Sequence, residues 1–292
     1  MQDYLVLTAS VITSGLLIGT IYAVVAAGLS LIHGTILMPQ ASNGQIFLGS
    51  GLLLWLFTTQ LGWPLWTAIP AVLLATIALI FILESIIFSR FYQNADRSIT
   101  YLVLTLGLAQ IFSGLYSGTF GKISDTFSVD PPVRGLAFLE PTPLPNARLL
   151  AFAAAAAVLC ALIAFLRFHR VGRSLRAVFQ NREVARLRGI NTVSVYRLAL
   201  GLGTAVSSVG GILYAFAFTI DLTVGWTMTL ITFAIMIVGG PGSVLGALCI
   251  GLIFGFTQAI VSVFADPTIA TFAYLLAMLI MLFIRPNGLF TR

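Results

Sequence analysis

The chain has 292 residues, of which 59% are hydrophobic and 8% are charged, and its mean hydropathy is +1.04. Soluble domains carry about 25% charged residues, so this composition excludes an ordinary soluble domain and predicts a polytopic membrane protein. The apolar runs have the length of about 20 residues that membrane helices need, not the alternation of about 10 residues that is typical of an outer-membrane barrel. The net charge of +6 does not indicate nucleic-acid binding, because the charges lie in loops that flank apolar runs.

We expect an all-α fold that forms one transmembrane domain over residues 1–292, with eight to ten membrane-spanning helices. The apolar segments cover approximately residues 5–32, 46–61, 65–88, 99–119, 149–166, 195–220, 222–238, 244–264 and 269–284. The second and seventh are candidates for half-helices, of the kind that broken helices form in transporters. Gly-x-x-x-Gly pairs at 15/19, 114/118, 242/246 and 251/255 predict close helix contacts.

A polar stretch, 33–47, follows the first apolar segment. Pro39 removes a backbone donor there, and Gly44 loosens the chain. Two interpretations stay open: a surface loop, or a helix broken at membrane depth, which is tolerated where it lines a cavity or is buried in protein. In the second case neutral polar side chains would line a solute path, together with two polar residues of segment 99–119. These candidates are Gln40, Ser42, Asn43, Gln45, Thr105 and Gln110.

The loop charges predict an orientation. Segment 120–148 is rich in proline and carries three charges of each sign, which fits an outer loop. If the N-terminus lies outside and the segments alternate, the inner loops hold twelve arginines and the outer segments hold three basic residues. The positive-inside rule then places the N-terminus outside and the C-terminus in the cytoplasm. Glu84, near the end of its apolar segment, is expected to reach the interface or an arginine, although an acid inside a membrane is also a functional candidate.

The loop 167–195 is the only long basic segment of the chain. Its apolar residues Leu175, Val178, Phe179, Val184 and Leu187 recur near helical spacing, on both sides of an Asn-Arg-Glu break. Gly189 follows as a helix C-cap residue. The pattern predicts two short amphipathic helices at the cytoplasmic membrane surface, long enough to fit a groove on a partner.

Several kinds of chemistry are not expected. The only lysine, Lys122, does not stand in a G-x-x-x-x-G-K-[ST] pattern, so no nucleotide site is predicted. No Ser/His/Asp set or carboxylate pair is placed for catalysis, and the isolated His33 and His169 make a metal site improbable. The middles of the apolar segments lack the charged relay of ion-coupled carriers. We therefore expect a non-enzymatic chain whose energy source lies elsewhere and acts on the loop 167–195.

Three stretches now show a resemblance. Residues 172–178 and 183–191 read Gly-Arg-Ser-Leu-Arg-Ala-Val and Glu-Val-Ala-Arg-Leu-Arg-Gly-Ile-Asn, residues 239–247 read Gly-Gly-Pro-Gly-Ser-Val-Leu-Gly-Ala, and residues 285–290 read Arg-Pro-Asn-Gly-Leu-Phe. With Tyr-Ala-x-x-Ala-x-Gly-Leu-x-Leu-Ile at 22–32, they cover nearly the whole chain. The chain resembles the permeases of branched-chain amino-acid type ABC importers, specifically the shorter of the two permease subunits.

The resemblance implies a subunit of a bacterial inner-membrane importer that moves its solute by alternating access. Its partners would be a second, related permease subunit, two ATP-binding cassette subunits docked on residues 170–191, a periplasmic solute-binding protein, and membrane lipid. ATP and magnesium would bind to the ATPase partners, with no cofactor in this chain. The implied coupling residues are Arg176, Arg182, Glu183, Ala185 and Gly189, and the implied gating turn is Gly239, Gly240, Gly242 and Ser243.

One departure bears on the solute. The family commonly has an Asn-Phe-Ala-His-Gly motif after the first span, whereas residues 40–44 here read Gln-Ala-Ser-Asn-Gly. Branched-chain amino acids are the first expectation for the solute, and urea, short amides or carboxylates remain alternatives with the same architecture. An ion-coupled secondary carrier or a channel remains a rival class, which would need no ATPase.

Overall fold

The computed structural model describes residues 2–91, 98–132, 136–139, 142–264, 267–284 and 288–290. Four of the basic residues that served to orient the chain, Arg97, Arg134, Arg285 and Arg292, lie outside the described residues, as does part of the outer loop 120–148. The remaining candidate residues of the break, the coupling loop and the gating turn all lie within them.

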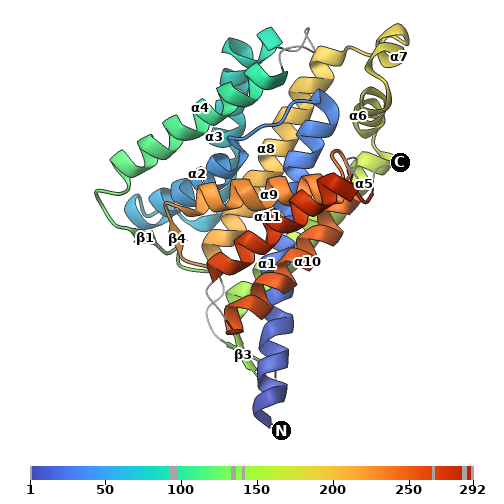
Figure 1. The fold of residues 1–292 in the computed structure, drawn as a ribbon. Coiled ribbons are helices and arrows are strands. Elements are labelled where there is room, and N and C mark those ends of the chain that lie inside the picture. The colour runs from blue at the N-terminus through green and yellow to red at the C-terminus, as the bar shows by residue number, and fades with distance from the viewer. Residues whose placement is uncertain are drawn as a thin grey trace.

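The chain is predominantly helical (Figure 1). The helices are α1 Gln2–Ile36, α2 Asn43–Trp55, α3 Leu65–Ile86, α4 Ser98–Thr119, α5 Asn146–Phe168, α6 Arg170–Gln180, α7 Arg182–Leu187, α8 Thr192–Ala217, α9 Val224–Gly239, α10 Val244–Phe264 and α11 Pro267–Ile284. A π-helical turn, Leu56–Gln60, continues α2, and a 3-10 turn, Phe88–Phe91, follows α3. Four short strands form two antiparallel pairs. These are β1 Thr126–Phe127 with β4 Ile220–Asp221, and β2 Leu136–Leu139 with β3 Thr142–Pro145.

The all-α membrane class is confirmed. Six helices of the described part are long and apolar enough to cross a membrane, namely those that contain Ser10–Ile36, Leu65–Ile86, Ile99–Thr119, Asn146–Phe168, Thr192–Ala217 and Val244–Val263. Two further apolar helices, α9 and α11, are shorter. The segments predicted to be half-helices correspond to α2, with 13 residues, and α9, with 16 residues.

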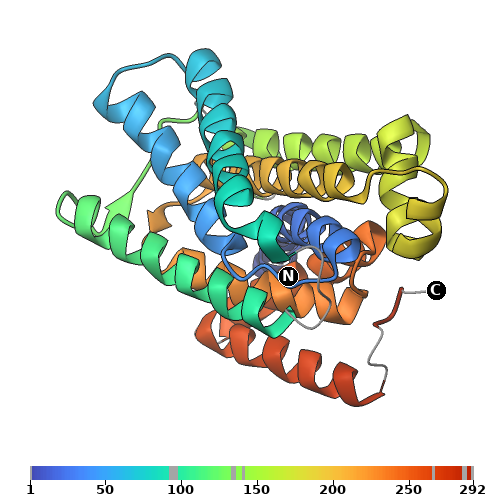
Figure 2. The same ribbon diagram turned by 90° about the horizontal axis from the view of Figure 1, so that it is seen from above.

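Helix α1 lies at the centre of the bundle, with α5 and α8 on one side and α9 and α10 on the other (Figure 2). Small residues allow this close packing. A Cβ atom added to Gly28 would lie 2.5 Å from the carbonyl oxygen of Gly203 on α8. The predicted pair Gly15 and Gly19 packs in the same way against α10. The pair at 114/118 behaves differently, because no atom of the described residues lies within 4 Å of a Cβ built on either glycine.

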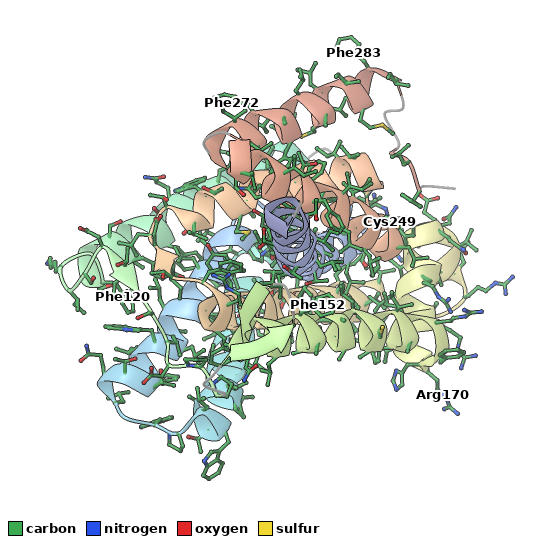
Figure 3. The ribbon with its side chains drawn as sticks, turned by 90° about the horizontal axis from the view of Figure 1, so that it is seen from below. Phe120, Phe152, Arg170, Cys249, Phe272 and Phe283 are labelled. Carbon is green, nitrogen blue, oxygen red and sulfur yellow. The ribbon has the colours of Figure 1, made fainter. Side chains whose placement is uncertain are left out.

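The peripheral helices present apolar side chains to the outside. Phe272 and Phe283 of α11 project away from the bundle (Figure 3), and both are exposed. Exposed apolar residues also occur along α3 and α4, including Leu74 and Ile111. A helix surface of this kind suits contact with lipid tails or with another membrane helix. Apart from Gln110 on α4, the polar residues discussed below lie inside the bundle or at its ends.

Candidate functional site

The chain leaves helical geometry between Ile36, where α1 ends, and Asn43, where α2 begins. We call residues 37–42 the break. Leu37 opens it with φ 60°, a left-handed conformation that costs a bulky side chain about 1–2 kcal/mol. Its amide N–H still donates to the carbonyl oxygen of His33, at 2.8 Å. Pro39 follows two residues later and supports the end of α1.

The polar residues of the break and of the first turn of α2 are buried inside the protein. Gln40, Asn43 and Gln45 are fully buried, and Ser42 is 1% exposed. Of the two interpretations of this stretch, a surface loop is therefore excluded. A broken helix whose polar groups are enclosed by protein agrees with what membrane depth permits.

Several amide atoms in this buried cluster have no hydrogen-bond partner among the described residues. They are the Oε1 atom of Gln40, both amide atoms of Asn43 and both amide atoms of Gln45. Each buried polar group without a partner costs about 1–3 kcal/mol. Such groups are normally satisfied by protein, water or ligand, so these five atoms can bind a polar molecule that enters the cluster.

Helices α4 and α9 enclose the break. The hydroxyl of Thr105 on α4 accepts a hydrogen bond from the amide of Ala41, at 3.1 Å. Tyr116, further along α4, donates its hydroxyl to the carbonyl oxygen of Gln45, at 3.2 Å. On the α9 side, Gly44 packs directly against Thr229, where a Cβ atom would clash with the threonine hydroxyl. The structure thus brings Thr105 to the break, as predicted.

The predictions and the geometry differ at three residues. Gln110 is exposed on α4, so the structure does not bring it together with the other path candidates. Thr229 contacts the break at Ala41 and Tyr116 contacts Gln45 in the first turn of α2, and neither was predicted. A tyrosine or a threonine inside an apolar helix carries no pattern that marks it as part of a site, because both are also common in helix packing.

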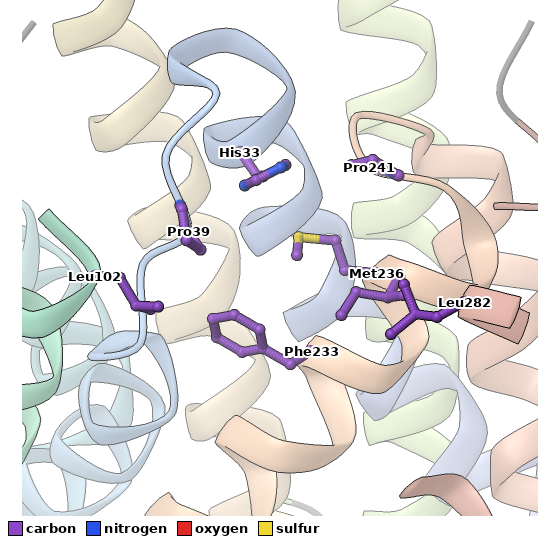
Figure 4. Close-up of a pocket in the computed structure, with 8 residues that line it drawn as sticks. His33, Pro39, Leu102, Phe233, Met236, Pro241 and Leu282 are labelled. Atoms are coloured by element: carbon purple, nitrogen blue, oxygen red, sulfur yellow. The ribbon is translucent and has the colours of Figure 1, made fainter. Parts of the chain in front are cut away.

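Two cavities adjoin the break. One of about 280 Å³ is lined by His33, Pro39, Leu102, Phe233, Met236, Ile237, Pro241 and Leu282, most of which are labelled in Figure 4. The second, of about 240 Å³, is lined by Ala41, Leu102, Leu106, Thr229, Leu230, Phe233, Ile237, Leu275 and Met278. Because Leu102, Phe233 and Ile237 line both, the two cavities are neighbours. Together they extend along the break on the side of α4, α9 and α11.

The basic loop forms the two short helices that its pattern predicts, α6 and α7. Each begins with a side-chain cap. The Nδ1 atom of His169 accepts from the amide of Val171, and the Oδ1 atom of Asn181 accepts from the amides of Glu183 and Val184. Gly189, with φ 82°, follows the end of α7, as expected of a C-cap glycine.

The apolar residues of the loop face two directions. Leu175 and Val178 of α6 are buried against the bundle, whereas Val184 and Leu187 of α7 are exposed, Leu187 to 87%. The two helices thus do not share one apolar face. Helix α6 uses its apolar face to pack on the helix bundle, whereas the apolar face of α7 stays exposed.

The candidate coupling residues take different positions in this loop. Ala185 is buried, Arg182 is half-buried and Glu183 is exposed. Arg176 is exposed on α6 and donates to the carbonyl oxygen of Arg167, at 3.1 Å, which ties α6 to the end of α5.

The glycine turn between α9 and α10 lies next to α6. Gly240 and Gly242 adopt φ 97° and 83°, which favour glycine, and the hydroxyl of Ser243 accepts from the amide of Gly246 at the start of α10. The amides of Leu289 and Phe290 donate to carbonyl oxygens at the end of α9. A cavity of about 530 Å³ lies here, lined by Arg176, Phe179, Gln180, Pro241, Gly242, Ser243 and Phe290.

Glu84, near the end of α3, has an ionic partner. Glu84 is 2% exposed, and its Oε1 atom accepts from the Nε atom of Arg197 at 3.0 Å. The expected contact with an arginine is therefore confirmed. The ion pair joins α3 to the start of α8, and it gives Glu84 a structural role apart from the break.

Comparison with known proteins identifies the family. The model of a family described as "Branched-chain amino acid transport system / permease component" matches residues 11–285. The chain belongs to this family. The permease is 25% identical to the high-affinity branched-chain amino acid transport system permease protein BraD of Pseudomonas aeruginosa, over 96% of this chain and 95% of that protein. It is also 25% identical to the corresponding permease proteins LivH of Escherichia coli K12 and of Salmonella typhimurium, over 96% of this chain and 94% of each relative.

These relatives agree with the site geometry. In this member of a permease family, the break holds a buried polar cluster and α7 exposes its apolar face. Among the described residues no group of three or more histidine, cysteine, aspartate or glutamate side chains is placed to hold a metal ion.

Proposed function

We propose that this permease is the transmembrane subunit of an ATP-driven importer for a small polar solute, with branched-chain amino acids as the first solute class to test. The observation that carries the proposal is the α6–α7 loop, in a chain that belongs to the permease family. The loop packs on the bundle through α6 and leaves the apolar face of α7 exposed. The chain itself is non-catalytic, and ATP and magnesium bind to two separate ATPase subunits.

The chemistry of α7 supports docking of those ATPases. Leu187 and Val184 form a small exposed apolar surface with Arg182, Arg186 and Arg188 around it. An apolar centre with a charged rim is the usual composition of a protein interface. Asn181 is both the C-cap residue of α6 and the N-cap residue of α7, so the two helices join at a single capped residue and a push on α7 is passed to α6.

The buried amides support a solute path through the break. The cluster offers both donors and acceptors and contains no charged side chain among Gln40, Ser42, Asn43 and Gln45. It therefore suits a solute without net charge, such as an amino-acid zwitterion, urea or a short amide; a carboxylate remains the least favoured alternative. In the proposed cycle, closure of the ATPases changes the access of the two cavities from one side of the membrane to the other.

The topology of the proposal follows the charges. The permease lies in the inner membrane of a bacterial cell. Its α6–α7 loop and its C-terminus face the cytoplasm, and its N-terminus faces the outside. A second, related permease subunit completes the transmembrane part, and a periplasmic binding protein delivers the solute. The exposed apolar helices supply surface for such a permease contact as well as for lipid.

The first experiment is purification of the permease in mild detergent from its native membrane. The expected result is co-purification of two ATPase subunits and a second permease, with ATP-dependent solute uptake after reconstitution into vesicles. The change Leu187→Asp should release the ATPases while the permease stays folded. The matched control is Leu61→Asp, the same change at an exposed leucine just after the π-helical turn that continues α2, which should retain them. A permease that purifies alone and still moves solute without ATP would contradict the proposal and favour a carrier or channel.

A further inference from the structure

We infer that Phe179 is the positioning residue through which movement of the coupling loop reaches the solute path. Its ring contacts the end of α1 just before the break and the glycine turn that joins α9 to α10. The inference rests on the proposed function, because an ATPase must move the loop. It adds the side chain that connects docking of the ATPase on the loop with a change in access to the cavities beside the break.

The contact geometry at Phe179 is close on two sides. A Cβ atom added to Gly242 would lie 2.5 Å from the Cε2 atom of the ring, and one added to Gly34 would lie 3.3 Å from its Cδ2 atom. The two glycines also touch each other, since the added Cβ of Gly34 would lie 2.5 Å from the Cα atom of Gly242. Phe179, Gly34 and Gly242 therefore form one three-way contact, which exists only because both backbone positions lack a side chain.

Gly34 connects this contact to the break. It lies in the last turn of α1, three residues before Leu37, and the helix continues to Ile36. A helical turn is stiff, so a displacement of Gly34 is passed along the helix to Leu37. Leu37 has the strained left-handed conformation, so the chain changes direction there. Beyond it lie Gln40 and the other buried amides.

Gly242 connects the same contact to the opposite side of the cavities. It belongs to the turn after α9, and α9 carries Phe233 and Ile237, which line both cavities beside the break. Thr229 of the same helix packs on Gly44 at the start of α2. A shift of Phe179 would therefore displace the break and the helix that faces it together.

The ring also has room to move. Phe179 is 39% exposed and lines the cavity of about 530 Å³ between α6 and the glycine turn. The neighbouring residues Leu175 and Val178 are buried, so α6 itself stays attached to the bundle. A flat, rigid side chain with packed glycines on one side and open space on the other can be displaced without unfolding its helix.

The test measures radiolabelled leucine moved per ATP hydrolysed in vesicles that contain the complete importer. For Phe179→Ala we expect the ATPases to stay bound and to hydrolyse ATP at a rate within about twofold of the original, while solute uptake falls at least tenfold. Phe179→Leu keeps part of the apolar volume and should lose only two- to fivefold. The matched control is Phe168→Ala, the same change in the same loop at a phenylalanine that is 74% exposed; its ratio should not change.

The outcomes separate the two proposals. An unchanged ratio of uptake to hydrolysis in Phe179→Ala overturns the role of Phe179, even if the importer works as proposed. If Phe179→Ala fails to assemble with the ATPases, Phe179→Leu serves as the test. An unchanged ratio of uptake to hydrolysis in an assembled Phe179→Leu importer also overturns the role of Phe179. If the original permease binds no ATPase at all, the proposed function fails instead.

Discussion

The packing of α1 on α8 makes a prediction that a single methyl group can test. In Gly28→Ala, the new Cβ atom would lie 2.5 Å from the carbonyl oxygen of Gly203 and 2.6 Å from the hydroxyl of Ser207. The first distance is 0.9 Å short of the 3.4 Å at which ordinary contact begins. The obstacle is backbone, which no rotamer change can remove, so α1 and α8 must separate locally.

The magnitude follows from two opposing effects. Overpacking a close contact costs about 1–3 kcal/mol. Alanine in place of glycine inside a helix returns about 0.5–1 kcal/mol. We therefore expect Gly28→Ala to lower the free energy of unfolding by about 1–2 kcal/mol, a factor of about ten in the folding equilibrium.

The control is the same change at Gly114 on α4, where no atom of the described residues lies within 4 Å of the added Cβ. At Gly114 only the more favourable helix propensity of alanine remains, so Gly114→Ala should leave the free energy of unfolding unchanged or raise it by up to about 1 kcal/mol. The assay is equilibrium unfolding of the purified permease, without partners, in mixed micelles titrated with SDS. A Gly28→Ala variant as stable as the original, or a Gly114→Ala variant destabilised by a similar amount, would refute the packing argument.

Three further predictions use the same unfolding assay or the purified complex. Arg197→Ala leaves the buried Glu84 carboxylate unpaired and should destabilise the permease by about 2–3 kcal/mol, below the ~3–5 kcal/mol of a fully buried pair because Arg197 is half exposed. Glu84→Gln should cost less, because the charge that it leaves unpaired, on Arg197, can be solvated. Asn181→Ala removes the cap of α7 and should cost about 1 kcal/mol of local stability, which we expect to weaken retention of the ATPases in the purified complex. Asn181→Asp keeps the acceptor oxygen and should retain the ATPases. An equal loss of ATPases in both variants would contradict the role of the cap. Leu37→Gly should change the free energy of unfolding by less than about 1 kcal/mol, because relief of about 1–2 kcal/mol of strain offsets both the entropy cost of glycine and the loss of a side chain that is 47% exposed. A loss above about 2 kcal/mol would show that Leu37 is not strained.

Sequence patterns predicted the parts of this fold that local chemistry determines. The apolar segments, the break near Pro39, the two helices of the basic loop and the cap at Gly189 each follow from propensities within a few residues. Because an isolated charge inside a membrane is costly, Glu84 was expected to reach either the membrane interface or an arginine. Its partner is Arg197, 113 residues away. Such a partner cannot be selected from the sequence, because several arginines lie in the same loops.

Tertiary contacts decided the rest. The apolar stripes of α6 and α7 look alike in the sequence, yet one is buried and the other exposed, because α6 packs on α1, α5 and α8, whereas α7 packs mainly on α6 and α8. The Gly-x-x-x-Gly pairs at 15/19 and 114/118 also look alike, and only the first meets another helix of the described chain. Thr105 and Gln110 are both polar residues of α4, but the helical turn puts them on different faces, so one reaches the break and the other does not.

The central position of α1 also has a consequence for biosynthesis. Helix α1 is synthesised before the helices that surround it, and Ala217, the last residue of its neighbour α8, is made 181 residues after Ile36. At about 5–20 residues per second, α1 waits roughly 10–40 s before that partner is complete. During that interval its glycine face and the buried amides that follow it meet lipid or insertion machinery instead of α8 and α10.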